Sequence, residues 1–159
     1  MNTKGMGIAL ATMALGAASV APAHASDAGL RKTVKRYEHR VSPQAKAFGD
    51  ADRALASATD TNTAAAAAGT FRKGLHGYKV ALVPIKTQTA NAAAGKKQML
   101  TAIREFDIGL VEYQKLLDKV NGGAPKDSLQ SSFVTLNKRF REAAKDEVSA
   151  LKLLGFTSK

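Results

Sequence analysis

Apolar residues recur at alternating steps of four and three along most of the chain, and they divide it into four segments. The clearest row consists of Met99, Ile103, Phe106, Leu110, Tyr113, Leu117 and Val120. A mean step of 3.5 residues places one side of an α-helix against neighbouring helices, whereas a strand alternates every second residue. The pattern therefore predicts helices at about 27–58, 62–88, 92–121 and 125–154.

The other three segments carry rows of the same spacing. The first row is Leu30, Val34, Tyr37, Val41, Gln44, Phe48, Ala51 and Leu55. The second row is Ala64, Ala68, Phe71, Leu75, Tyr78, Leu82 and Ile85. The fourth row is Leu129, Phe133, Leu136, Phe140, Ala144, Val148 and Leu151, and its longer step after Phe140 keeps Glu147 off the apolar side. Gln44 is then the one clearly polar residue that we expect in the core.

Short polar segments separate the predicted helices. Residues 59–63 are Thr, Asp and Asn, which favour helix starts, and 121–125 reads Asn-Gly-Gly-Ala-Pro, a stop and a restart. Short connections between long helices force neighbours to run antiparallel, so the predicted fold is an all-α, up-down-up-down four-helix bundle. Pro43 and Pro84 lie inside predicted helices and either kink or break them.

The first 25 residues have the features of a secretory signal peptide. Lys4 precedes an uncharged apolar run over 6–20, and 21–25 supplies small residues in an Ala-x-Ala arrangement. That run is shorter than the roughly 20 residues of a membrane span. We therefore expect cleavage after Ala25, a secreted or extracytoplasmic protein, and one mature domain over 26–159.

The net charge of +11 is distributed unevenly in the predicted bundle. One end collects 26–41, 79–104 and 145–159, which hold thirteen Lys and Arg but four Asp and Glu, a net charge of +9. Two predicted helix starts at this end add N–H donors for an anion. The candidate anion-binding residues are Arg31, Lys32, Lys35, Arg36, Lys96 and Lys97.

These cations predict electrostatic association with an anionic envelope polymer or membrane surface. Alternatively, the charge only keeps the protein soluble. The cations are spread around the helices and are not interleaved with aromatic residues, which argues against sequence-specific nucleic-acid binding. The oligomeric state stays open.

No catalytic or metal-binding constellation is visible in the sequence. The chain has no Cys, which excludes disulfides, thiol catalysis and Cys-based metal or haem motifs. His39 and His76 are predicted to face outward at different heights, and so are Glu105 and Glu112 on the third helix. We therefore predict a non-enzymatic protein without a metal or cofactor, and we rank an envelope enzyme third among the possible functions.

Three glycines interrupt the second predicted helix, where each costs about 1 kcal/mol relative to Ala. They are Gly69, Gly74 and Gly77. Either another helix approaches closely here, or the bundle widens to admit a small apolar or cofactor ligand. The second interpretation is the alternative function, with a pocket formed by Phe71, Gly74, Gly77 and Tyr78.

Overall fold

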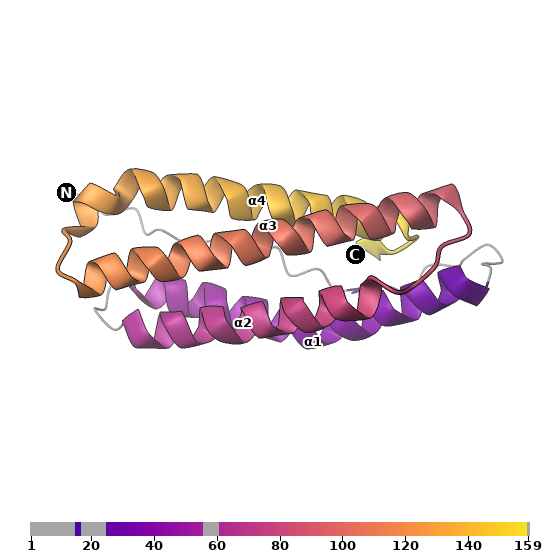
Figure 1. The fold of residues 1–159 in the computed structure, drawn as a ribbon, viewed down its shortest axis with the longest axis horizontal. Helices are drawn as coiled ribbons and strands as arrows, with labels where there is room; N and C mark the ends of the chain where they lie inside the picture. The colour runs from indigo at the N-terminus through magenta and orange to yellow at the C-terminus, as the bar shows by residue number, and fades with distance from the viewer. Residues whose placement is uncertain (1–14, 17–24, 56–60, 159) are drawn as a thin grey trace.

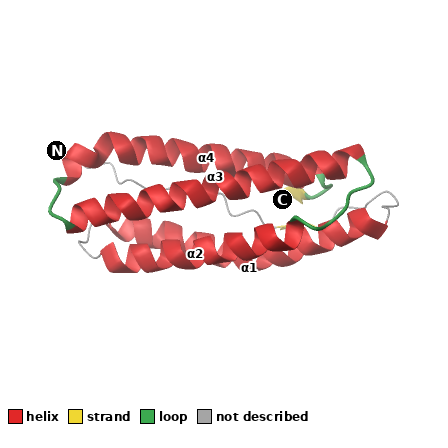
Figure 2. Cartoon of the chain, in the orientation of Figure 1, coloured by secondary structure: helices red, strands yellow, loops and turns green. Residues whose placement is uncertain are grey.

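The computed structural model describes residues 15–16, 25–55 and 61–158, and four long helices dominate it (Figure 1). The helices are α1 (Ala25–Leu55), α2 (Thr61–Leu82), α3 (Ala90–Asn121) and α4 (Gln130–Leu153), with a short 3-10 helix, η1 (Lys126–Leu129), before α4. They lie side by side in an elongated bundle, and successive helices run in opposite directions (Figures 1 and 2). The all-helical prediction with four helices is confirmed for the described residues.

Two very short strands accompany the helices. Strand β1 (Leu15–Gly16) pairs antiparallel with β2 (Thr157–Ser158), which follows α4. β1 lies within the predicted signal peptide, and the remainder of 1–24 lies outside the described residues.

The apolar rows read from the sequence form the core. In the third row every residue from Met99 to Leu117 is at most 3% exposed. At mid-bundle, aromatic rings from all four helices meet. The Phe48 ring lies 5.0 Å from Tyr113 and 5.7 Å from Phe140, and Phe71 lies 5.8 Å from Phe106, measured between ring centroids. This cluster ties the helices together through side-chain burial.

The two internal prolines affect their helices differently. α1 continues through Pro43, which is exposed and costs the helix one backbone hydrogen bond. By contrast, α2 ends at Leu82, before Pro84, so the predicted end at 88 is wrong. Proline disfavours helical geometry in the residue before it, and here Lys96 Nζ donates to the carbonyl oxygens of Val83 at 2.8 Å and Ile85 at 2.5 Å.

The helices are not equally spaced. The backbones of α1 and α4 approach each other less closely than those of α1–α2, α2–α3 and α3–α4. Glycines on α3 allow its close approach to α4 and the residue that follows it, because a Cβ on Gly109 would lie 2.7 Å from Phe140 and one on Gly95 would lie 2.7 Å from Leu154. The wider spacing between α1 and α4 makes room for polar side chains between them.

Candidate functional site

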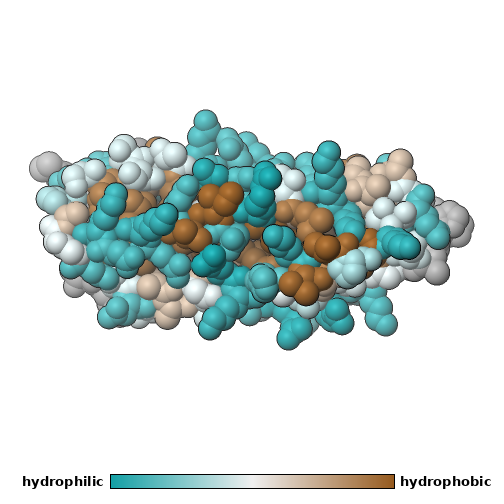
Figure 3. Space-filling view, in the orientation of Figure 1, coloured by the Kyte–Doolittle hydropathy of each residue, from teal (hydrophilic) through white to brown (hydrophobic). Residues whose placement is uncertain are grey.

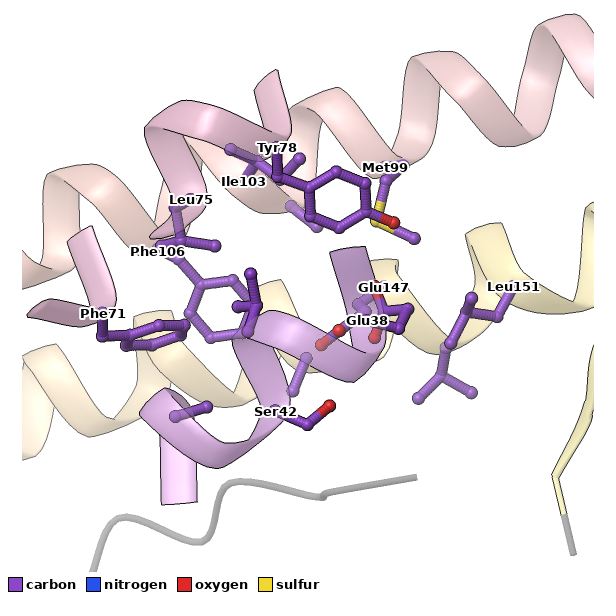
Figure 4. Close-up of a pocket in the computed structure, with 15 residues that line it drawn as sticks. Glu38, Ser42, Phe71, Leu75, Tyr78, Met99, Ile103, Phe106, Glu147 and Leu151 are labelled. Atoms are coloured by element: carbon purple, nitrogen blue, oxygen red, sulfur yellow. The ribbon is translucent and has the colours of Figure 1, made fainter. Parts of the chain in front are cut away.

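A small cavity lies among the four helices, toward the end where α1 begins (Figure 4). Its volume is about 30 Å³, enough for one or two water molecules. The outer part of its lining is half-buried and comes from α1 and α4, namely Ser42, Ala45 and Val148. The apolar inner lining includes Val41, Phe71, Leu75, Met99, Ile103, Phe106 and Leu151.

Two carboxyl groups meet in this cavity. Glu38 comes from α1 and Glu147 from α4, and their carboxyls lie next to one another (Figure 4). Glu38 is 7% exposed, Glu147 is half-buried, and the Glu38 carboxyl interacts with both Glu147 and Tyr78. Two neighbouring carboxylates in an apolar setting are costly to ionise together.

The environment of the pair shifts both pKa values upward. Burial raises the pKa of Glu147 well above its usual 4.5, and the charge of Glu38 adds to the rise. Burial also raises the pKa of Glu38, while its interactions with Glu147 and Tyr78 oppose part of that rise. The pair therefore retains a proton at pH values where an isolated glutamate has lost it.

Tyr78 of α2 completes the polar part of the cavity. Its side chain is 2% exposed, and its hydroxyl faces the Glu38 carboxyl, to which it can donate. Burial, and then the charge of Glu38, raise the pKa of Tyr78 well above 10, so it stays a neutral phenol. Its ring stacks on Tyr37 with a centroid distance of 5.2 Å, and the Arg36 and Arg40 guanidinium groups lie 5.2 and 5.7 Å from the Tyr37 ring centroid.

The four residues of the predicted ligand pocket do not all come together. Phe71 and Tyr78 line the cavity, whereas Gly74 and Gly77 lie against α1. A Cβ on Gly74 would collide with Gln44 Oε1, while one on Gly77 would make an ordinary contact of 3.6 Å with Tyr37. Both glycines therefore pack against side chains of α1, and neither lines the cavity.

Sequence reasoning missed the two acids of the cavity. The prediction that Gln44 is the only clearly polar core residue is wrong, because Asp27, Glu38, Asp52 and Thr61 are buried. A signal existed at Glu147, which continues the seven-residue spacing of Phe133 and Phe140. The row does shift to Ala144 and Leu151, as predicted, but the gap between α1 and α4 also admits the Glu147 side chain.

The polar residues expected to face outward do so or are paired. His39 and His76 are exposed and stand apart from the cavity. Glu105 and Glu112 lie 2.6 and 3.3 Å from the Arg139 guanidinium of α4, so they tie α3 to α4. Within the described part of the chain, no group of three or more His, Asp or Glu residues is placed to hold a metal ion.

The six predicted anion-binding residues differ in their surroundings. Lys32, Lys35, Arg36 and Lys97 are exposed. Arg31 is half-buried beside Gly155, and Lys96 is engaged by the carbonyl oxygens that follow α2. Four of the six are therefore available to a partner, and the other two serve the fold.

Backbone N–H groups at the start of α3 already donate to side-chain oxygens of the same chain. The Asp27 carboxylate accepts from the backbone N–H groups of Gln88 at 2.9 Å and Thr89 at 3.1 Å. Thr89 Oγ1 in turn accepts from the N–H of Ala92 at 3.2 Å. These contacts bring α1 and α3 to the same end of the bundle, but they occupy donors that we expected an external anion to use.

The acids of this end are turned inward. Asp27 and Glu38 are buried, and Glu147 and Asp146 are half-buried. In the described ranges, none of the six candidate cations forms an ion pair. The solvent-facing surface of this end is therefore more positive than its sequence composition indicates. Hydrophilic side chains also cover most of the face in Figure 3, broken by separate apolar patches.

Comparison with known proteins adds no relative. No protein-family model matches the chain, and neither the curated proteins nor the solved structures gave a match. Among the described helices, none is long and apolar enough to cross a membrane.

Proposed function

We propose that the protein is an exported, non-enzymatic helical bundle that associates electrostatically with an anionic envelope polymer or surface. Export rests on the signal-peptide features of residues 1–25. The basic end supplies the binding surface, formed by the exposed cations Lys32, Lys35, Arg36 and Lys97. The observation that carries the proposal is the inward placement of the acids at this end, which leaves these four cations without ion-pair partners among the described residues.

The chemistry of such a contact is simple. Lys32, Lys35 and Arg36 lie within little more than one turn of α1, and Lys97 lies on α3 at the same end. Exposed cations attract a polyanion over about 8 Å at physiological ionic strength, and added salt weakens that attraction. The association is therefore salt-sensitive and tolerant of the detailed structure of the polyanion.

Retention on a sulfated-polysaccharide column tests this function. The variant K32Q/K35Q/R36Q/K97Q should elute at a clearly lower salt concentration than the wild type, because it loses four exposed charges from the basic end. The matched control is K115Q/K119Q/K138Q/R141Q, which removes four exposed charges from elsewhere on α3 and α4. Circular dichroism should show that both variants are folded.

The two variants must behave differently for the proposal to stand. If both shift equally, retention follows total charge and the basic end has no special role. If the wild type itself elutes at low salt, the charge serves solubility alone.

A second function is supported by the cavity. We propose that it receives a small apolar ligand, because most of the side chains that line it are apolar. Phe71 and Tyr78, both predicted for this role, are part of the lining.

A further inference from the structure

We infer that an open groove between α2 and α3 binds one strand of a linear, unbranched polyanion, with Lys73, Lys79 and Arg104 as its main contacts. This inference rests on the proposed association with an anionic envelope polymer, and it adds a site and a shape for that polymer. The two helices lie side by side along the bundle (Figure 1), and the groove between them has a volume of about 460 Å³.

Basic side chains line both walls of this groove. They are Arg72, Lys73, His76 and Lys79 on α2 and Arg104 on α3. Asp107 is the one acid among the described lining residues, so four Lys and Arg against one Asp give a net charge of +3 with the histidine neutral. Lys73, His76 and Lys79 are exposed and form no ion pair within the described residues. These three side chains are therefore available to an anionic partner.

A groove between α3 and α4 provides a comparison within the same molecule. Its volume is about 380 Å³, and its charged lining residues in the described chain are Glu112, Lys115 and Lys119. Two Lys against one Glu give it a net charge of +1. The two grooves share α3 and are similar in size, so the excess of positive charge is the property that singles out the α2–α3 groove.

The spacing of the cations suits an extended strand. Lys73, His76 and Lys79 follow one another at steps of three residues, so the two lysines lie about 9 Å apart along the axis of α2. Arg104 lies on the α3 wall, and the exposed Lys97 precedes it by seven residues on the same side of α3, about 10 Å away. The groove therefore leads toward the basic end, and one strand with repeated anionic groups can contact both.

The shape of the groove favours a strand over a flat surface. Leu75 and Ile103 are buried and line the groove, so they form its base. A narrow chain can lie over this base with cations of both helices beside it. A flat membrane surface instead meets the outermost side chains of one or two helices and leaves the groove unfilled.

The probe is a fluorescently labelled, heparin-derived hexasaccharide, a linear polyanion of defined length, titrated into the purified full-length protein and followed by anisotropy. K73Q/K79Q should weaken binding by about three- to tenfold, because it removes two exposed cations from the groove. The matched control K115Q/K119Q removes two exposed lysines from the comparison groove and should bind within about twofold of the wild type.

Removal of the groove's acid tests the same site in the opposite direction. Asp107→Asn frees the Arg72 guanidinium, which pairs with Asp107 at 2.6 Å, so the affinity for the hexasaccharide should rise by about two- to fivefold. The control Asp118→Asn removes an exposed acid of α3 outside the groove and should change the affinity less. Equal effects of the two changes, in variants that are folded by circular dichroism, would show that the strand does not enter the groove.

The remaining outcomes separate this site from the proposed function. Equal losses in K73Q/K79Q and K115Q/K119Q would overturn the groove inference but leave association with a polyanion standing. Binding to vesicles of phosphatidylcholine and phosphatidylglycerol, without binding to the hexasaccharide, would make a membrane surface the partner and would also overturn the inference alone. Failure to bind either probe at low salt would overturn both the inference and the proposed function.

Discussion

Glu38 and Glu147 are the residues whose placement most needs a physical reason. A buried pair of like-charged groups adds little to stability, and apolar residues of similar size usually serve a core better. The fold tolerates the pair because a retained proton reduces the repulsion between the two carboxyls, as the raised pKa values of both groups indicate. A second acid, Asp52, lies beside Tyr113, where burial and then the charge of Asp52 raise the pKa of the phenol. Asp52 thus faces a tyrosine alone, whereas the cavity brings two acids together beside one.

Glu147→Gln should make the protein more stable, and more so as the pH rises. A carboxyl whose native pKa lies above its unfolded value stabilises the fold below the usual pKa of 4.5, and this contribution is lost as the pH rises through the native value. Gln keeps the shape, cannot ionise and can still donate to Glu38. Near pH 8 the variant should exceed the wild type by on the order of 1 kcal/mol in the free energy of unfolding, measured with urea.

The matched control is Glu142→Gln, which alters an exposed acid of the same helix. Its difference from the wild type should not change with pH. If the Glu147→Gln curve runs parallel to that of the wild type between pH 4.5 and pH 8, the pKa of Glu147 is not raised in the folded protein.

At the scale of helices, unequal spacing organises the bundle. Gly95 and Gly109 let α3 approach Leu154 and Phe140 closely, and Arg139 links the same two helices through Glu105 and Glu112. No comparable backbone approach joins α1 to α4 within the described residues. The cavity and its acids occupy the side of the bundle that is packed less tightly.

Two glycine-to-alanine changes test this account of helix spacing. Gly109→Ala places a methyl group 2.7 Å from the buried Phe140 ring and should lower the free energy of unfolding by about 1–3 kcal/mol. Gly69→Ala makes an ordinary contact of 3.8 Å with Gln114 and should be neutral or stabilise by up to about 1 kcal/mol. Urea unfolding curves measure both. Equal effects would show that α3 and α4 adjust freely.

At the scale of the whole molecule, acidic side chains lie inside one end of the bundle and basic side chains lie on its surface. Acids from α1 and α4 turn inward, while Lys32, Lys35, Arg36 and Lys97 face solvent. The hydrophobic core formed by the described residues runs from Leu30 to Leu154, entirely after the predicted cleavage site. Of the predicted signal peptide, the structure describes β1, which pairs with β2, and Ala25, the first residue of α1.

Removal of residues 1–25 should therefore leave the bundle intact. The shortened protein loses the partner of β2 but no described core residue, so its helical circular dichroism and its Tm should stay close to those of the full chain. A chain that ends at Leu153 is the contrast, because it loses the buried Leu154 side chain and should be less stable by about 2–5 kcal/mol. Loss of cooperative unfolding after removal of 1–25 would contradict this view of the domain.

The four helices and most of their buried residues follow from spacing along the chain, because an amphipathic helix repeats its pattern every few residues and local spacing reveals the buried side. The end of α2 was misplaced, although Pro84 marked it as a possible stop. Contacts between helices place Glu38 beside Glu147, Asp27 at the start of α3 and Lys96 against the carbonyl oxygens that follow α2. These contacts depend on the distance between helices, which is set by the side chains of both partners together. No periodicity within one segment encodes that distance.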